Sequence, residues 1–230
     1  MREKLDISAY LVVGPENTLG RDVSDVVRDA VRAGFTCVQI RSKACSAREL
    51  IDCAAGAACV IAQEGKSDSV ALLVDDRLDV VLAAREAGVK VDGVHVGQSD
   101  IPVEVCRKLL GPDAIVGLSA RASEMIEYVR TTDVSCVDYF GVGPLHETET
   151  KRDCGMDAEG NIIVRTLAEI AELERVSPLP IVVGGGVKAC DLPDLKKTGV
   201  AGFFVVSAVC AAESPYEAAR ELVRSWNAGR

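Results

Sequence analysis

Residues 35–63, FTCVQIRSKACSARELIDCAAGAACVIAQ, contain the pattern that decides the fold. Residues 35–40 are a short, mostly apolar run, which predicts a buried strand, and residues 46–63 have the spacing of a helix. A parallel strand that is buried on both faces is nearly continuously apolar, whereas a half-exposed strand alternates apolar with polar residues. This strand–loop–helix unit therefore predicts part of a parallel sheet covered by helices.

The same unit recurs along the whole chain. Further strands are predicted at residues 9–13, 71–74, 92–96, 114–118, 135–140, 180–183 and 202–206, and further helices at 23–33, 77–87, 102–110, 123–130, 162–176, 191–197 and 216–226. We expect these eight units to close into an α/β fold, a single (β/α)8 TIM barrel that forms one domain over residues 1–230. Because chemistry in such barrels lies at the carboxyl ends of the strands, polar residues just after each strand are the candidates.

Composition and charge narrow the class of partner. The formal net charge is −9 and the chain has no basic block, which argues against nucleic acid or an anionic membrane. No run approaches the roughly 18 apolar residues of a membrane span, and we expect a cytoplasmic protein. The cysteine count is odd, and Cys37, Cys136 and Cys210 lie within apolar strand patterns, so we interpret them as reduced core residues.

The stretch DYFGVGPLHETETKRD, residues 138–153, has the chemistry of an anion-binding loop. Its glycines allow close approach of the backbone to a phosphate, Thr148 and Thr150 supply hydroxyls, and Lys151 supplies positive charge. The loop extends over about residues 142–160, longer than the usual connection of roughly two to six residues. We interpret it as a loop that covers the substrate.

The strand at residues 35–40 is followed by an amide and two cations. Because side chains alternate along a strand, Gln39 and Arg41 share one face, and Lys43 is next in phase. The alternative is an ordinary solvated loop. Gln39 favours a site at the barrel mouth, since a polar side chain near the interior costs free energy unless it is paired.

Two carboxylates follow neighbouring strands. Asp76 and Asp100 are expected to lie close together, because adjacent parallel strands are about 4.8 Å apart. Mg²⁺ typically takes one or two protein carboxylates and completes its shell with water and substrate phosphates. Alternatively, Asp75 or Asp76 caps the following helix. We interpret His95, which has no partner of metal-binding spacing, as a hydrogen-bonded barrel residue.

A second anion site is predicted after the last two strands. Gly184, Gly185 and Gly186 follow one strand, and Val206-Ser207 follows the other. Backbone amides in these two loops, beside a short helix start, form the phosphate site of many barrels of this type.

These motifs together resemble the thiamine phosphate synthase family over nearly the whole chain. The segments that carry the resemblance are VQIRSK (38–43), DDRLD (75–79), DGVHVGQSD (92–100), GLSAR (117–121), DYFGVGPLHETETK (138–151), GGGV (184–187) and VVSA (205–208). The resemblance implies a transferase that joins 4-amino-2-methyl-5-hydroxymethylpyrimidine diphosphate to a thiazole phosphate and releases pyrophosphate. In this family the diphosphate is thought to depart first, which produces a carbocation stabilised by the pyrimidine ring. The thiazole nitrogen then captures this carbocation.

The resemblance also implies a role for each site residue. The residues implied to bind the pyrimidine diphosphate are Gln39, Ile40, Arg41, Ser42, Lys43, Asp75, Ser119 and Lys151. Those implied to bind the thiazole phosphate are Thr148, Glu149, Thr150, Gly186, Val206 and Ser207. The implied Mg²⁺ ligands are Asp76 and Asp100. Arg41, Lys43 and Lys151 would stabilise the charge of the leaving group. The expected partners are the two small-molecule substrates, and a second copy of the chain is a further candidate.

One residue departs from the family pattern. The family usually has Asn-Asp where this chain has Asp75-Asp76, which adds negative charge where a diphosphate must bind. Arg77, a lysine or a second cation could compensate Asp75, or the carboxylate could weaken the site. Two alternatives to the synthase therefore remain: a thiazole tautomerase, against which Asp76, Gln98 and Asp100 argue, and a noncatalytic sensor of thiazole phosphate.

Overall fold

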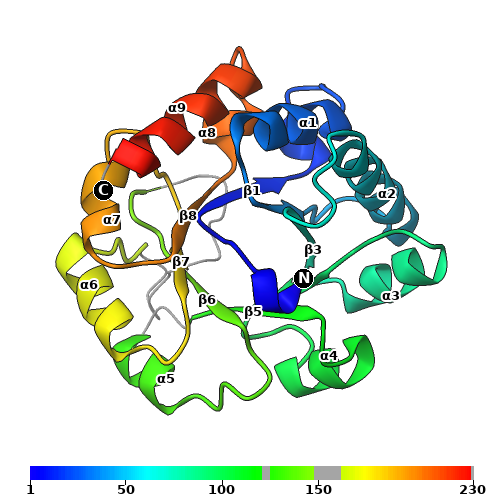
Figure 1. Cartoon of the computed structure of the whole chain (residues 1–230). Coiled ribbons are helices and arrows are strands. Elements are labelled where there is room, and N and C mark those ends of the chain that lie inside the picture. Colours follow the sequence, from blue (N-terminus) through cyan, green and yellow to red (C-terminus); the bar gives the residue numbers. More distant parts are fainter. Residues whose placement is uncertain (121–124, 148–161, 229–230) are drawn as a thin grey trace.

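The computed structural model describes residues 1–120, 125–147 and 162–228 of the chain. Within them, eight parallel strands close into a barrel in chain order, and β1 pairs with both β2 and β8 (Figure 1). The strands are β1 (Ala9–Val13), β2 (Cys37–Ile40), β3 (Ala71–Asp75), β4 (Gly93–Val96), β5 (Ile115–Ser119), β6 (Tyr139–Val142), β7 (Ile181–Val183) and β8 (Gly202–Val205). The predicted (β/α)8 barrel is confirmed.

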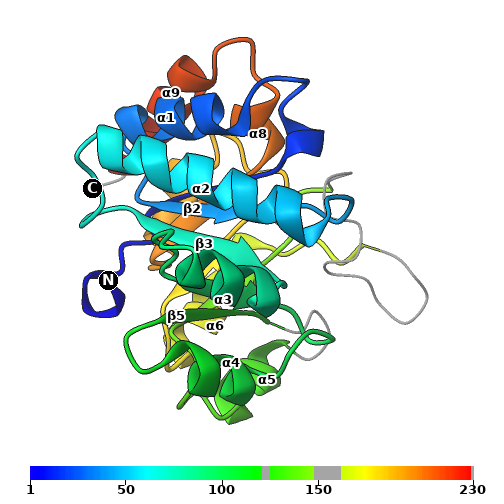
Figure 2. The same ribbon diagram turned by 90° about the vertical axis from the view of Figure 1, so that its right-hand side faces the viewer.

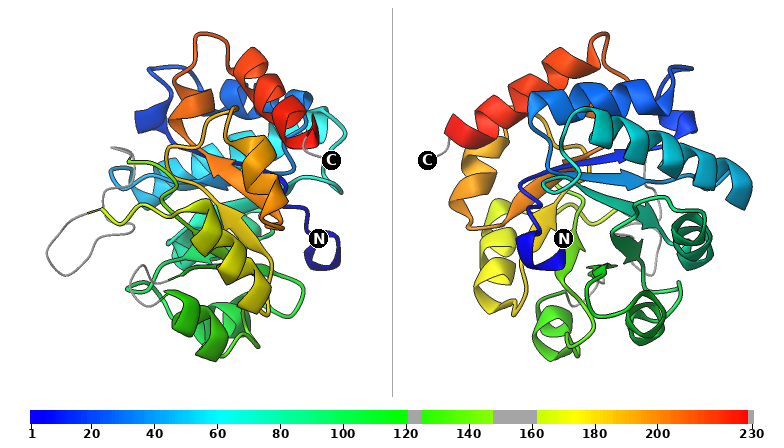
Figure 3. Two further views of the ribbon diagram at one scale, coloured as in Figure 1. Left: turned by 90° about the vertical axis from the view of Figure 1, so that its left-hand side faces the viewer. Right: turned by 45° about the vertical axis from the view of Figure 1, so that its right-hand side comes forward.

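Helices cover the outside of the barrel, as the side views show (Figures 2 and 3). They are α1 (Val23–Ala33), α2 (Ala47–Gln63), α3 (Leu78–Glu86), α4 (Val103–Leu110), α5 (Met125–Thr131), α6 (Leu167–Val176), α7 (Leu192–Lys197), α8 (Ser207–Cys210) and α9 (Pro215–Ala228). Short 3₁₀ turns lie at η1 (Arg2–Lys4) and η2 (Pro15–Asn17). None of the helices in the described ranges is long and apolar enough to cross a membrane.

Local capping chemistry sets the helix boundaries. Gly34, at φ 109°, ends α1 in the left-handed conformation that favours glycine, and Ser46 begins α2 through a reciprocal capping box with Glu49. The predicted start of the sixth main helix at residue 162 was wrong. That helix, α6, begins at Leu167 because Thr166 and Glu169 form a second capping box.

The sixth strand also begins later than predicted, at Tyr139 rather than at residue 135. Residues 134–137 turn before it, and Asp138 accepts a hydrogen bond from Val116 N at 2.8 Å. Cys136 is consequently only partly buried, which corrects its assignment to the core, whereas Cys37 and Cys210 are buried thiols as predicted.

The apolar core has two layers. Between sheet and helices, Phe35, Phe203 and Trp226 belong to the large outer cluster, with Phe203 in ring contact with both others. Inside the barrel, Tyr10 and Tyr139 pack among small and aliphatic side chains. The interior is therefore filled, and ligands are restricted to the ends of the barrel.

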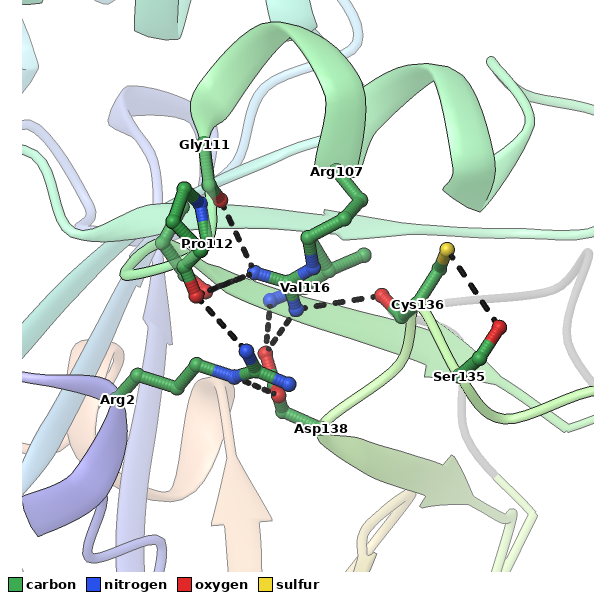
Figure 4. A network of polar contacts seen from close by, with 9 residues as sticks. Arg2, Arg107, Gly111, Pro112, Val116, Ser135, Cys136 and Asp138 are labelled. Carbon is green, nitrogen blue, oxygen red and sulfur yellow. Dashed lines mark hydrogen bonds and ion pairs between the residues drawn. The ribbon is translucent and has the colours of Figure 1, made fainter.

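At the amino-terminal end of the barrel, Asp138 is held by two guanidinium groups (Figure 4). Arg2 Nε donates to Asp138 Oδ1 at 2.6 Å, and Arg107 Nη2 donates to Oδ2 at 2.7 Å. This triad ties the first turn of the chain to β6, at the edge of a hollow of about 880 Å³. Residues at this end of such a barrel serve stability rather than chemistry.

Candidate active site at the carboxyl ends of the strands

Gln39, Arg41 and Lys43 lie along the end of β2 as the alternation predicts. Gln39 and Arg41 are buried, with exposed fractions of 4% and 8%, whereas Lys43 is exposed at the mouth. The side chain of Ile40 instead packs in the outer core. Ser42 Oγ accepts hydrogen bonds from the amides of Ala44 and Cys45, which shapes the turn after the strand.

The negative charge of Asp75 is compensated from β2. Arg41 Nε lies 3.0 Å from Asp75 Oδ2, and both side chains are almost completely buried. Arg77 does not serve this purpose, because its guanidinium donates two hydrogen bonds to Asp79, at 2.8 and 2.6 Å. Of the alternatives left open by the sequence, compensation by Arg77 is therefore wrong, and Arg41 supplies the countercharge.

Asp76 has a strained backbone. Its φ of 59° lies in the left-handed region, which costs a non-glycine residue about 1 kcal/mol or more. The conformation is held by a hydrogen bond from Asp76 N to the carbonyl of His95 at 2.8 Å, and Lys43 forms an ion pair with the carboxylate. Helix α3 begins at Leu78, and Arg77 occupies the N-cap position without a side-chain cap, so neither Asp75 nor Asp76 has the capping role that was the alternative.

Asp76 and Asp100 lie close enough for their carboxyl groups to share a hydrogen bond. Burial and this hydrogen bond raise the pKa of Asp100, although the amide of Gly97, donating to Asp100 Oδ2 at 2.7 Å, opposes the shift. Burial also acts to raise the pKa of Asp76, but hydrogen bonds with Lys43 and Asp100 outweigh it and lower that pKa. Two carboxylates in such contact repel each other when both are charged, unless a cation lies between them.

The pair fits a hard cation with few protein ligands. Across the described ranges, no group of three or more His, Cys, Asp or Glu side chains is placed to hold a metal ion. Mg²⁺ does not require such a group, since it keeps several waters and binds substrate phosphates. The oxygen donors of Asp76 and Asp100 therefore suit Mg²⁺ better than a softer metal.

The loop after β6 rests on the loop after β7. Leu145 N donates to Gly184 O at 3.0 Å and His146 N donates to Gly185 O at 2.9 Å. A Cβ atom on Gly185 would lie 2.5 Å from Pro144 Cβ, and Gly186 is similarly close to His146. Both glycines have positive φ, of 83° and 70°. Each position therefore favours glycine for two reasons, the backbone conformation and the lack of room for a Cβ atom.

The remaining predicted phosphate residues lie after β7, at the start of α8 and outside the described part of the chain. Val206 precedes α8, and Ser207 is its first residue, so both lie at the start of a short helix as expected. Gly186 lies in the β7 loop. Thr148, Glu149, Thr150 and Lys151 fall outside the described residues.

His95 is a hydrogen-bonded barrel residue, which confirms its interpretation from the sequence. Its Nδ1 lies 2.9 Å from the Tyr139 hydroxyl and its Nε2 lies 2.9 Å from Ser119 Oγ. The sequence reasoning missed Tyr10 and Tyr139, which extend this contact to Gln39. The sequence carried no signal for them, because the room that Gly117 leaves, where a Cβ atom would lie 2.3 Å from the Tyr139 hydroxyl, is seen only in the structure.

Comparison with known proteins decides the family. The sequence model described as thiamine monophosphate synthase matches residues 9–209. The thiamine-phosphate synthase of Corynebacterium efficiens is 39% identical over 230 residues, covering 100% of both chains, and that of Azorhizobium caulinodans is 37% identical over 224 residues, covering 96% of both. The chain belongs to the thiamine monophosphate synthase family. This membership confirms the resemblance that the sequence motifs indicated.

Solved structures agree with the assignment to the thiamine monophosphate synthase family. A thiamine phosphate pyrophosphorylase from Pyrococcus furiosus matches with a TM-score of 0.78 at 26% identity, covering 99% of this chain and 98% of that one. A 3-hexulose-6-phosphate synthase matches with a TM-score of 0.62 at 15% identity, which shows the shared barrel fold alone.

Proposed function

We propose that this protein condenses 4-amino-2-methyl-5-hydroxymethylpyrimidine diphosphate with a thiazole phosphate, giving thiamine phosphate and pyrophosphate. The observation that carries the proposal is the meeting of two carboxylates, Asp76 and Asp100, with Lys43 at the mouth of a barrel of this family. A thiazole tautomerase would have no use for this pair, because it does not act on a diphosphate.

The diphosphate leaves more readily where positive charge is already in place. Lys43 is exposed at the mouth and is the cation best placed to meet the leaving group, while Arg41 lies deeper beside Asp75. Lys151 completes the set in the proposal. Asp76 and Asp100 would hold Mg²⁺, which when bound supplies further positive charge for the diphosphate oxygens.

The thiazole phosphate is assigned to the opposite side of the mouth. Gly186 and the backbone at Val206 and Ser207 supply a turn and a helix start, both of which present amides to an anion. Thr148, Glu149 and Thr150 are proposed to close over it from the loop after β6. Capture by the thiazole nitrogen requires no general base for bond formation, which is consistent with the engagement of His95 in the barrel interior.

The setting of the reaction is part of the proposal. The substrates are small molecules, and we place the enzyme in the cytoplasm with neither nucleic acid nor membrane as a partner. The net charge of −9 supports the absence of nucleic acid and of an anionic membrane as partners. Association into a homo-oligomer is a separate proposal that sedimentation velocity would test.

A noncatalytic sensor of thiazole phosphate is the second candidate, and the Arg41–Asp75 ion pair favours it. Each charge neutralises the other inside the mouth, which reduces the positive charge that a diphosphate would meet. Such a sensor would bind thiazole phosphate and form no product.

A coupled assay separates the two candidates. Pyrophosphate and thiamine phosphate are measured with both substrates present, with each omitted in turn, and with Mg²⁺ replaced by EDTA. Product that requires both substrates and Mg²⁺ supports the synthase. Binding of thiazole phosphate by folded protein without product contradicts the synthase and supports the sensor.

A further inference from the structure

A row of buried polar side chains crosses the inside of the barrel and ends at the mouth. Gln39 Nε2 donates to the Tyr10 hydroxyl at 2.8 Å, the hydroxyls of Tyr10 and Tyr139 lie 2.9 Å apart, and His95 connects Tyr139 to Ser119. The first four of these residues are each at least nine-tenths buried. Polar groups so deep in a barrel are costly unless every proton has an acceptor.

The direction of these hydrogen bonds follows from counting protons. Burial is the main cause that raises the pKa of both tyrosines well above the usual value, so each phenol keeps its single proton. Tyr10 accepts the Gln39 amide proton and has its own proton to donate. Among the described residues, its strong acceptor is Tyr139, since the nearby Cys37 sulfur accepts only weakly.

The same assignment of protons extends from Tyr139 to Ser119, at the end of the row. Tyr139, having accepted from Tyr10, donates its proton to His95 Nδ1. The ring proton of the neutral imidazole is then on Nε2, which donates to Ser119 Oγ. Ser119 Oγ, at the end of β5, then accepts this proton and keeps its own hydroxyl proton for a further acceptor.

The backbone of Ser119 is fixed as well. Gln98 Nε2 donates to the Ser119 carbonyl at 2.6 Å and to the Tyr128 hydroxyl at 2.8 Å. Two glycines make room for the rings of the row: a Cβ on Gly117 would lie 2.5 Å from His95 Nδ1, and one on Gly141 would lie 3.0 Å from His95 Cε1. The strands on both sides are thus fitted to this arrangement.

We infer that the row is a directional hydrogen-bond chain that presents Ser119 as a hydrogen-bond donor to the aminopyrimidine diphosphate substrate. His95 and Tyr139 are its positioning residues, acting through Ser119 without touching the substrate. A donor hydroxyl matches the acceptors of that substrate, its ring nitrogens and its diphosphate oxygens, and does not match the exocyclic amino group, which donates. The inference rests on the proposed function for the identity of the substrate, whereas the direction of the chain does not.

Nitrogen-15 NMR of histidine-labelled protein tests the direction without any substrate. The chain contains only two histidines, so a His146→Gln variant assigns the His95 signals. We expect a protonated Nε2 and an unprotonated, hydrogen-bonded Nδ1. A proton on Nδ1 would overturn the inference, because the whole row would then run the other way.

Binding measurements test the role of the chain. Tyr139→Phe removes one hydroxyl and keeps the ring. Tyr139→Phe and Ser119→Ala, each as a single variant, should weaken binding of the pyrimidine diphosphate by roughly five- to tenfold. Thiazole phosphate should bind unchanged, Ser119→Thr should restore affinity, and Tyr216→Phe on α9 is the matched control. If Tyr139→Phe alters neither the His95 signals nor pyrimidine affinity, the positioning role is refuted.

Failure of the proposed function gives a different result. Protein with the expected His95 signals that forms no product from both substrates would refute the synthase and support the direction of the chain.

Discussion

Arg41 and Asp75 form a buried ion pair across β2 and β3, with Nε and Oδ2 3.0 Å apart. Their strands are direct neighbours, and Ile40 is in register with Val74 one residue earlier on each strand. The pair therefore results from the barrel register, and it joins a cation proposed for the diphosphate to the one residue that departs from the family pattern.

Replacing Asp75 with asparagine should retain or improve turnover. The substitution keeps the shape of the side chain and releases the positive charge of Arg41 toward the diphosphate. Steady-state kinetics should show a lower KM for the pyrimidine diphosphate, by about threefold to tenfold for roughly 1 kcal/mol of recovered attraction. A large loss of kcat would instead give the carboxylate a role of its own.

Asp100→Asn should stabilise the metal-free protein at neutral pH. Burial and the contact with Asp76 raise the pKa of Asp100 above its unfolded value, so the folded protein binds more protons than the unfolded chain. The free energy of unfolding then falls as the pH rises from the pKa of Asp100 in the unfolded chain through its pKa in the folded protein. Above the pKa of the folded protein the loss is complete. Thermal unfolding between pH 4 and 8 should show a higher Tm for the variant only at the upper end.

Two controls accompany that measurement. Asp68→Asn, at an exposed carboxylate, should leave the pH dependence unchanged. Added Mg²⁺ should raise the Tm of the original protein and have little effect on Asp100→Asn, because binding to the folded state alone stabilises it. Equal responses of both proteins to Mg²⁺ would count against a metal site at Asp76 and Asp100.

Gly185→Ala should impair the thiazole phosphate site more than it impairs folding. The new Cβ would lie 2.5 Å from Pro144 Cβ, so the loop after β6 must move. Gly88→Ala is the matched control, since its φ of 81° carries the same backbone strain in open space. Both variants should lose about 1 to 2 kcal/mol of stability from that strain, but only Gly185→Ala should raise the KM for thiazole phosphate. Similar kinetics in the two variants would contradict the assignment of this loop contact to the site.

Asp138→Asn should destabilise the fold by about 3 kcal/mol, because it leaves two guanidinium groups at the barrel end without their countercharge. Glu217→Gln, which breaks the exposed pair with Arg220 on α9, should cost less than about 1 kcal/mol. Urea unfolding of the two variants measures the difference. Equal losses would show that burial of the triad contributes nothing.

The sequence predicted the strand order and most helix boundaries because these depend on local signals. Ser46 and Gly34 marked helix ends correctly, and apolar runs marked the strands. The late start of α6 was missed although Thr166 and Glu169 carried its capping signal, because the apolar Ile162 and Ile163 before them extended the helical pattern.

Side-chain pairing within the site was less predictable. Alternation placed Arg41 on the correct face, but it does not say which of several nearby carboxylates a long side chain reaches. Tyr10 and Tyr139 are 129 positions apart and look like ordinary apolar strand residues. The two side chains come into contact because the barrel closes, and no local sequence pattern predicts that closure.

The tie between Arg2 and Asp138 has a consequence for synthesis of the chain on the ribosome. Arg2 is synthesised 136 positions before its partner, and β8 follows β1 at a still greater separation along the chain. Throughout that interval one edge of β1 has no neighbouring strand, and an open edge of apolar strand is prone to wrong pairing. The nascent protein is therefore most vulnerable to aggregation before β8 has been synthesised, because only β8 covers the open edge of β1.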